Sequence, residues 1–364
     1  MADSKSRNIF IALSGGVDSA TAAALLKEAG HEVTGVFLKV WTPEFGECPW
    51  REDRLAAMRC AASLDIPFQE VDVSDAYRRT VIENMIEEYR RGHTPNPDVL
   101  CNRAIKFGAL WEYARARGAE CIATGHHARI SPLGNPHGNE VPTYGLFRGK
   151  DAQKDQTYFL WRLTQDDLAH TLFPVGGMTK SEVRAYARTR RIPSAERPDS
   201  QGLCFVGDVD MHTFLKDLLK PERGAIYSLT GRIIGEHDGA ALYTLGQRHA
   251  FAVTDAEYAS TPVYVVGIDT ARNSVTVAPD IESAKRRTIY IHDENWIYAA
   301  PQSGSRLTGA IRYRAGAAPC TFERDDSYTK ILFDEAQLAV PGQSLVLYRE
   351  DECIGGGIIS QELN

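Results

Sequence analysis

Apolar residues in the first two hundred positions fall into short runs typical of buried strands and longer segments with helical spacing. The run NIFIAL at 8–13 predicts a strand. The segment 19–29, rich in Ala and Leu and followed by Gly30, predicts a helix that ends at a glycine. Further strands are predicted at 32–39, 68–73 and 120–124, and further helices at 54–64, 75–92 and 106–117. This order is typical of an α/β fold, a parallel sheet with helices on both faces.

The pattern changes near Phe205. Helical spacing fades after Leu219, and short strands bounded by Gly, Pro and Asp follow. These strands are predicted at 225–228, 263–269, 274–278, 307–314, 329–333, 344–349 and 353–359. Such a series indicates a small β-rich module and a closing β-barrel. We therefore predict three domains: an α/β domain at 1–208, a small central β-rich domain at 209–284 and a C-terminal β-barrel at 285–364.

The composition is that of an ordinary globular protein. The chain has 364 residues, of which 43% are hydrophobic and 24% charged, and its net charge is −7. A dedicated nucleic-acid binder is usually basic, although a local basic stripe on an acidic protein can still bind phosphates. Basic clusters occur at 78–79, 90–91, 184–191, 285–287 and 312–314, and each alone is more often a solvated face.

Targeting signals and cysteine spacing point to the cytoplasm. The first residues do not have the pattern of a signal peptide, and no stretch of about 18 apolar residues predicts a membrane span. Seven irregularly spaced cysteines do not suggest a secreted disulfide framework. The sequence has no C-x-x-C pair, the simplest sign of a zinc knuckle or an iron–sulfur cluster.

A glycine loop, SGGVDS at 14–19, lies directly between the first predicted strand and the first predicted helix. Two glycines allow a tight turn close to a phosphate, and the helix start offers main-chain N–H groups to an anion. Asp18 would be repelled by bare phosphate, so we expect it to meet Mg²⁺ or to cap the helix. The lysine of a Walker A loop is missing. The alternative is an ordinary glycine turn that opens a helix.

Two cysteines stand out because each lies among polar residues in a predicted loop, where function is commonly placed. Cys101 follows TPNPDVL at 94–100, and the two prolines around Asn96 are expected to keep this segment out of a helix and to stiffen it. Cys204 closes DSQGLC. A lone cysteine is usually a small buried hydrophobe, and this interpretation is applied to Cys48, Cys60, Cys121, Cys320 and Cys353.

These segments resemble a known family. SGGVDS is similar to the signature of the PP-loop ATP pyrophosphatases, which cleave ATP between its α and β phosphates. TPNPDVLCNRAIKF, ATGHHA, KDQTYFLWRL, LFPVGGMTKSEVR, DSQGLCFVG, YTLGQRHA, IRYRA and PGQSLVLY resemble, in order and over almost the whole chain, the blocks of the bacterial tRNA-specific 2-thiouridylases. The resemblance implies a PP-loop domain, a small central domain and a C-terminal barrel, the last two in contact with tRNA.

The resemblance also implies an activity. ATP and Mg²⁺ would adenylate the oxygen on carbon 2 of the wobble uridine of tRNA, and sulfur from a cysteine persulfide would replace it. Cys204 would carry the persulfide, Cys101 would attack it or release its sulfur through a transient Cys101–Cys204 disulfide, and Asp98 would transfer a proton. A sulfur-donor protein, either a relay protein or a cysteine desulfurase, would supply the sulfur.

The same resemblance assigns binding residues. The ATP site would comprise Ala12, Leu13, Ser14, Gly15, Gly16, Val17, Asp18, Ser19, Leu38 and Gly125, with Asp18 as a possible Mg²⁺ ligand. The target base would contact Asn96, Pro97 and Asp98. Other parts of the tRNA would contact His126, Lys154, Asp155, Gln156, Arg312, Tyr313 and Gln343.

Ordinary interpretations and other functions stay open. Residues 154–156 fit a polar turn, His126 and His127 fit satisfied residues beside the sheet, and 312–314 alternates like a strand with one wet face. Two departures from the family pattern are Val40, where Asn is usual, and His127, where Tyr is usual. The alternative functions are another PP-loop adenylating enzyme, such as an amidating synthetase, a cluster-dependent tRNA thiolase, or an RNA-binding protein with an inactive ATP loop.

Overall fold

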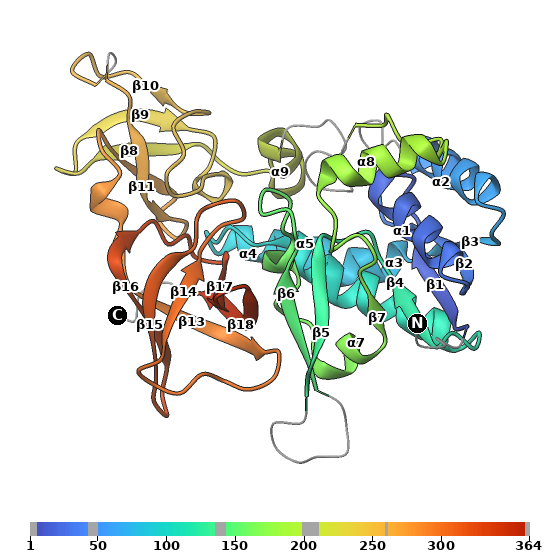
Figure 1. The fold of residues 1–364 in the computed structure, drawn as a ribbon. Coiled ribbons are helices and arrows are strands. Elements are labelled where there is room, and N and C mark those ends of the chain that lie inside the picture. The colour runs from blue at the N-terminus through green and yellow to red at the C-terminus, as the bar shows by residue number, and fades with distance from the viewer. Residues whose placement is uncertain (1–5, 43–49, 135–142, 199–210, 259–260, 361–364) are drawn as a thin grey trace.

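A five-stranded parallel sheet forms the centre of the N-terminal part of the computed structural model, which describes residues 6–42, 50–134, 143–198, 211–258 and 261–360 (Figure 1). The strand order is β3-β2-β1-β4-β7. The bounds are β1 (Asn8–Ala12), β2 (Glu32–Lys39), β3 (Phe68–Asp72), β4 (Cys121–Ala123) and β7 (Thr171–Leu172). The prediction of a parallel α/β sheet is confirmed, and β7 extends that sheet beyond the predicted strands.

Helices cover both faces of this sheet because side chains alternate along each strand. In β1, Ile9 and Ile11 belong to one apolar cluster and Phe10 to another. The first cluster packs against α1 (Val17–Glu28), α2 (Trp50–Ser63) and α8 (Lys180–Thr189). The second packs against the helix that follows residue 96. Alanines at 20 and 22–24 are buried in α1, and their small side chains let the helix pack closely.

The helix that follows residue 96 corrects an expectation about the segment around Cys101. Asp98 and Cys101 were expected in a loop, but α5 begins at Pro97 (Pro97–Cys101), continues as a π-helical segment (Asn102–Ala109) and ends as α6 (Leu110–Arg115). Proline is tolerated in the first helical position, where its missing N–H would have no partner. A similar π-helical segment (Arg78–Ile82) joins α3 (Ser74–Tyr77) to α4 (Glu83–Arg90). Such segments are frequent at functional sites.

A small sheet follows α9 (Met211–Leu219), with the order β10-β9-β8-β12-β11. Its strands are β8 (Gly224–Ser228), β9 (Ile233–His237), β10 (Ala252–Val253), β11 (Tyr264–Asp269) and β12 (Ser274–Ala278). The remaining short helices are α7 (Gln165–Ala169) and single 3₁₀ turns at 157–159, 240–242 and 282–284. No helix in the described ranges is long and apolar enough to cross a membrane.

Six strands close into the predicted C-terminal barrel, because β13 pairs with both β16 and β18. They are β13 (Arg286–Trp296), β14 (Arg306–Ala310), β15 (Ala318–Arg324), β16 (Thr329–Gln337), β17 (Ser344–Arg349) and β18 (Glu352–Ile359). One predicted strand is too long: β14 ends at Ala310, and Arg312–Arg314 form a turn. Arg314 has a φ of 61°, a left-handed conformation that cannot continue a strand.

A hairpin from the N-terminal part joins the barrel sheet, which the sequence did not predict. β5 (Ala128–Gly134) pairs with β6 (Thr143–Arg148), and β6 pairs with β18 through Leu146 and Phe147. Trp161 is fully buried in the apolar cluster that also contains Phe10 of β1 and Leu146 of β6. Its indole N–H donates to the Ser344 hydroxyl at 3.0 Å. The sheet domain and the barrel therefore share one apolar core.

We predict that Trp161→Ala weakens both the N-terminal part and the barrel. The change removes a fully buried indole and leaves the buried Ser344 hydroxyl without its donor. The expected loss is about 3–5 kcal/mol of unfolding free energy, measured by urea denaturation. Leu229→Ala is the control, because Leu229 is 60% exposed and its loss should change stability by about 0.5 kcal/mol or less. Equal effects of the two changes would contradict the shared core.

Candidate active site

The glycine loop lies at the carboxyl end of β1, where the strand order reverses between β2 on one side and β4 on the other. Open parallel sheets bind ligands at this switch point. Gly15 has a φ of +83°, and a side chain there would lie 2.6 Å from the Asp53 carbonyl oxygen in α2. Only glycine fits this close turn against α2.

The groups around the loop are suited to an anion. Helix α1 begins at Val17, and its N-cap Gly16 makes no side-chain cap hydrogen bond, so no side chain competes there for the first N–H groups. The hydroxyls of Ser14 and Ser19 lie 3.2 Å apart beside them. Arg197 donates to the Gly15 carbonyl at 3.3 Å and also pairs with Asp53. This donor set fits a phosphate group.

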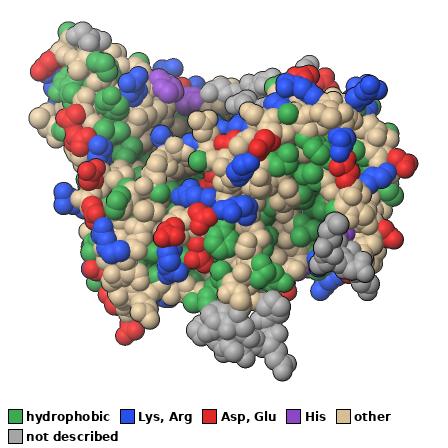
Figure 2. Space-filling view, in the orientation of Figure 1, with side chains coloured by type: hydrophobic (Ala, Val, Ile, Leu, Met, Phe, Trp, Pro, Cys, Tyr) green, Lys and Arg blue, Asp and Glu red, His purple; other side chains and the backbone are tan. Residues whose placement is uncertain are grey.

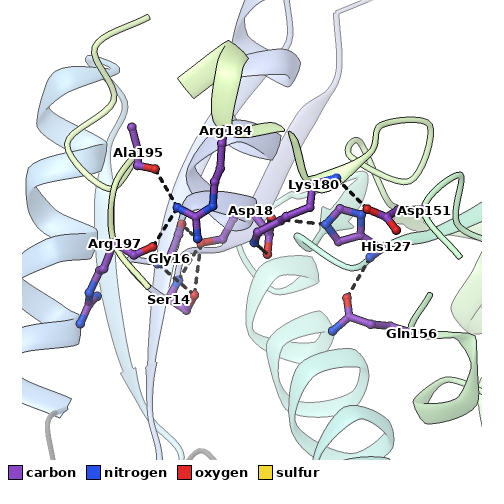
Figure 3. Close-up of polar contacts among 11 residues, drawn as sticks. Ser14, Gly16, Asp18, His127, Asp151, Gln156, Lys180, Arg184, Ala195 and Arg197 are labelled. Atoms are coloured by element: carbon purple, nitrogen blue, oxygen red, sulfur yellow. Dashed lines mark hydrogen bonds and ion pairs between the residues drawn. The ribbon is translucent and has the colours of Figure 1, made fainter. Parts of the chain in front are cut away.

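Asp18 does not cap α1, which corrects one of the two roles expected for it. Both oxygens of its carboxylate accept from the Lys180 ammonium, at 2.8 and 2.7 Å, and one lies 3.3 Å from Nε2 of His127 (Figure 3). Burial alone would raise the pKa of Asp18. The hydrogen bonds from His127 and Lys180, with the Lys180 charge, outweigh it and lower that pKa. Asp18 is therefore ionised and is already paired with the Lys180 ammonium.

A second group of residues lies at the start of α5. The Asn96 amide donates to the Tyr158 hydroxyl at 3.1 Å, and that hydroxyl donates to the Ser344 carbonyl at 2.9 Å. Burial raises the pKa of Asp98, against the opposing charge of Lys106. A raised pKa favours proton transfer near neutral pH. Cys101 is buried at the end of α5, and Cys204 lies outside the described residues.

Aromatic rings lie beside this group. The ring centroids of Phe159 and Tyr313 are 4.4 Å apart, and Tyr158 lies 6.3 Å from Tyr313. The Asn102 amide donates to the Phe159 carbonyl at 3.1 Å, which fixes this segment on the π-helical turn. Arg312, in the same turn as Tyr313, is exposed. The barrel therefore presents an aromatic ring beside Tyr158, the hydrogen-bond partner of Asn96, and an exposed cation in the same turn as that ring.

Four residues expected to contact tRNA have polar groups that already bond within the chain. Asp155 is buried and accepts from Arg148, the Gly149 N–H and Thr157. The Gln156 side-chain oxygen accepts the N–H of His127 at 2.9 Å. The other two are His126, whose ring lies between Phe107 and Phe173 and bonds to Thr124, and Gln343, whose amide donates to the carbonyls of Thr94 and Pro95. All four hold main chain or core in place, and their tRNA contacts stay predictions.

The other expected ATP-site residues lie along the same edge. Ala12 ends β1 and Leu13 follows it, Val17 opens α1, and Leu38 lies near the end of β2. Gly125 follows β4, and a side chain there would lie 2.6 Å from the Ser19 nitrogen, so the two segments touch. Lys154, expected to contact tRNA, is half-buried in the turn before Asp155.

Several contacts were not predicted. Lys180 and Arg197 reach the glycine loop from α8 and from the segment after it. Thr244 of the central module bonds to Thr94 through their hydroxyls at 2.9 Å, and Thr94 donates its N–H to the Pro341 carbonyl at 2.8 Å. In the sequence, only the position of Lys180 directly after Thr179 could have drawn attention to it. Thr179 begins a capping box and therefore marks the start of a helix.

Several residues of the basic clusters form ion pairs. Arg91 pairs with Glu87 and Glu88, while Arg188 and Arg190 pair with Glu196 and Glu28. Figure 2 shows acidic and basic side chains interspersed over the viewed face. These ion pairs fit the ordinary interpretation of solvated faces, whereas Arg312 and Arg314 are both exposed in the turn that carries Tyr313.

We predict that Gly15→Ala destabilises the protein far more than Gly16→Ala. The first change puts a side chain into a left-handed conformation and against α2, whereas a side chain at Gly16 would meet only the Ser14 hydroxyl at 3.5 Å. The expected loss for Gly15→Ala is roughly 2–4 kcal/mol, from backbone strain and overpacking. Thermal and urea unfolding of both variants test this, and comparable stabilities would contradict the loop geometry.

Comparisons with known proteins cover nearly the whole chain. Family models described as the tRNA methyl transferase HUP domain, the tRNA methyl transferase PRC-barrel domain and the aminomethyltransferase beta-barrel domain match residues 7–208, 212–279 and 286–359. Relatives named tRNA-specific 2-thiouridylase MnmA include those of Moorella thermoacetica (43% identical; 96% of this chain and 98% of the relative), Geotalea uraniireducens (41%; 100% and 97%) and Nitrosomonas eutropha (40%; 99% and 99%).

The names of these matches imply different reactions. Two of the family models are named for methyl transfer, whereas the relatives are named for thiolation. The relatives decide the matter, because each is a curated whole protein that matches nearly end to end, whereas each model describes one domain. On this basis the chain belongs to the family of tRNA-specific 2-thiouridylases.

Proposed function

We propose that this protein replaces the oxygen on carbon 2 of the wobble uridine of tRNA with sulfur, in an ATP-dependent reaction. The observation that carries the proposal is the identity of 40–43% with tRNA-specific 2-thiouridylases over nearly the full length. The anion-binding loop at the end of β1 and the group of Asn96, Asp98 and Cys101 at the start of α5 support it. No observation favours the amidating synthetase.

The glycine loop would hold the phosphates of ATP through the N–H groups of α1 and the hydroxyls of Ser14 and Ser19. ATP supplies an adenylyl group that makes the uracil oxygen a good leaving group. A magnesium ion would use the Asp18 carboxylate together with phosphate oxygens and water, since the described residues include no cluster of three His, Cys, Asp or Glu that could hold a metal. The Lys180 ammonium must then leave Asp18.

The protein's own residues would prepare the base and the sulfur. The base must leave its stack to be reached, and the exposed Arg312 and the Tyr313 ring offer backbone and stacking contacts beside Asn96. Asp98, with its raised pKa, would exchange a proton with the base. Cys204 would carry a persulfide, and Cys101 would resolve it through a transient disulfide.

The remaining parts of the proposal concern the setting of the enzyme. We place it in the cytoplasm, where a disulfide is a catalytic state and not a structural link. A sulfur-donor protein would load Cys204. The central and barrel domains, at 209–284 and 285–364, would contact the tRNA body and present the anticodon loop to Asn96.

We predict that the purified protein forms 2-thiouridine in unmodified tRNA only when ATP, Mg²⁺ and a persulfide donor are present. Cys101→Ser and Cys204→Ser should each slow the reaction by at least about 100-fold, because each removes a nucleophile. Mass spectrometry of the digested nucleosides measures the product. Cys320→Ser is the control, because this buried thiol lies in the barrel and bonds only weakly, to the Leu307 carbonyl. Formation of AMP and pyrophosphate without a thiolated base would mean that the acceptor is wrong.

We predict that Gln343→Ala impairs base positioning and spares nucleotide binding. The change frees the carbonyls of Thr94 and Pro95, which precede Asn96, but leaves the contacts of the glycine loop untouched. The expected result is a roughly 10-fold or larger fall in kcat for thiolation with an unchanged Kd for ATP, because misplacing a positioning group costs rate. If only the KM for tRNA rises, Gln343 is a direct tRNA contact and the positioning role is wrong.

A further inference from the structure

Lys180 occupies a position that helix stability does not explain. It is the first residue of α8, where the helix dipole disfavours a cation. The helix start is already stabilised by a capping box, in which Thr179 accepts from the Glu182 N–H and Glu182 accepts from the Thr179 N–H. The Asp151 carboxylate accepts the N–H of Lys180 at 2.9 Å. The fold thus fixes the main chain of Lys180 with groups that do not need its charge.

The side chain of Lys180 lies inside the nucleotide site. It is 12% exposed, and its ammonium reaches across from α8 to both carboxylate oxygens of Asp18 in the first turn of α1 (Figure 3). Asp18 is the second residue of α1, so the ammonium lies beside the helix start whose N–H groups would hold a phosphate. A phosphate held by those groups would come within reach of Lys180 after a change of its rotatable stem alone.

The neighbouring arginines, Arg197 and Arg184, form hydrogen bonds with main-chain carbonyls. Arg197 holds the Gly15 carbonyl and Asp53, and Arg184 donates to the carbonyls of Ala195 and Arg197 at 2.9 and 3.1 Å (Figure 3). These guanidinium groups shape the loop and the segment that covers it. Lys180, by contrast, contacts a carboxylate that is itself suited to a metal ion. Its pairing can be exchanged without disturbing the main chain.

His127 is a second hydrogen-bond partner of Asp18, and it would stay in place if Lys180 left the carboxylate. Its Nε2 lies 3.3 Å from Asp18, and its main chain is held on both sides by Gln156, which accepts its N–H and donates to its carbonyl at 3.1 Å. His127 is also buried at 2% exposure. Asp18 therefore keeps one fixed hydrogen-bond partner when Lys180 leaves.

We propose that Lys180 is a phosphate-binding residue, held on Asp18 in the nucleotide-free protein and transferred to the phosphates of ATP when Mg²⁺ takes its place on the carboxylate. This inference rests on the proposed function, in which the glycine loop binds ATP. The transfer keeps both charges compensated in both states, since Asp18 exchanges one cation for another and Lys180 exchanges one anion for another. No bond is made or broken in it.

The test separates phosphate binding from a structural role by comparing two ligands. Calorimetric titration of the full chain with ATP and Mg²⁺ should show an affinity at least 10-fold lower in Lys180→Met than in the wild type. Titration with adenosine, which lacks phosphates, should give the same Kd in both proteins. Lys180→Arg should recover part of the ATP affinity. Lys150→Met is the control, because it removes a more exposed lysine that pairs with Glu182 on the same helix.

Each other outcome overturns one identified claim. Equal ATP affinities in Lys180→Met and the wild type would overturn the phosphate role, and a parallel loss of adenosine binding would make Lys180 structural. A wild type that does not bind ATP would overturn the proposed function instead. If Lys180→Met does not fold, Asp18→Asn combined with Lys180→Met leaves no buried charge unpaired. That double variant should then bind ATP at least 10-fold more weakly than Asp18→Asn alone, and equal binding would again overturn the proposal.

Discussion

The close approach of two main-chain segments at the carboxyl ends of β1 and β4 is the constraint on which the site depends. A side chain at Gly125 would strike the Ser19 nitrogen, so only glycine lets the segment after β4 lie against the first turn of α1. This contact puts His127 against Asp18. It also places the loop at the point where the parallel strand order reverses, and the sheet thus creates the anion site before any side chain contributes.

A second constraint joins the three parts of the chain at the segment before Asn96. The β6–β18 pairing fixes the barrel on the sheet domain, so Gln343 and the Pro341 carbonyl reach Thr94 from the barrel. Thr244 reaches the same residue from the central module. The position of Asn96 is therefore set by contacts between domains and not within one, which explains why residues far from the base can govern how it is held.

The sequence predicted local elements well and their partners poorly. Alternation of apolar residues identified most strands because it reflects burial of alternate side chains, and the glycine loop was found because tight turns demand glycine. The helix start at Pro97 was missed because proline was given its usual role as a breaker. Asp155 and Gln343 were expected to face tRNA, yet their inward bonds depend on tertiary neighbours that no local pattern encodes. Lys180 is a partner of this kind, 162 residues from Asp18.

His127, at the position where the family resemblance leads us to expect tyrosine, fits the same electrostatic scheme. A neutral imidazole with a proton on Nε2 and a phenol both offer one polar hydrogen to a carboxylate, so either can hold Asp18 from this position. Gln156 fixes the main chain of His127, which keeps the imidazole beside Asp18. The substitution therefore preserves the hydrogen bond that Asp18 needs while Lys180 changes partners.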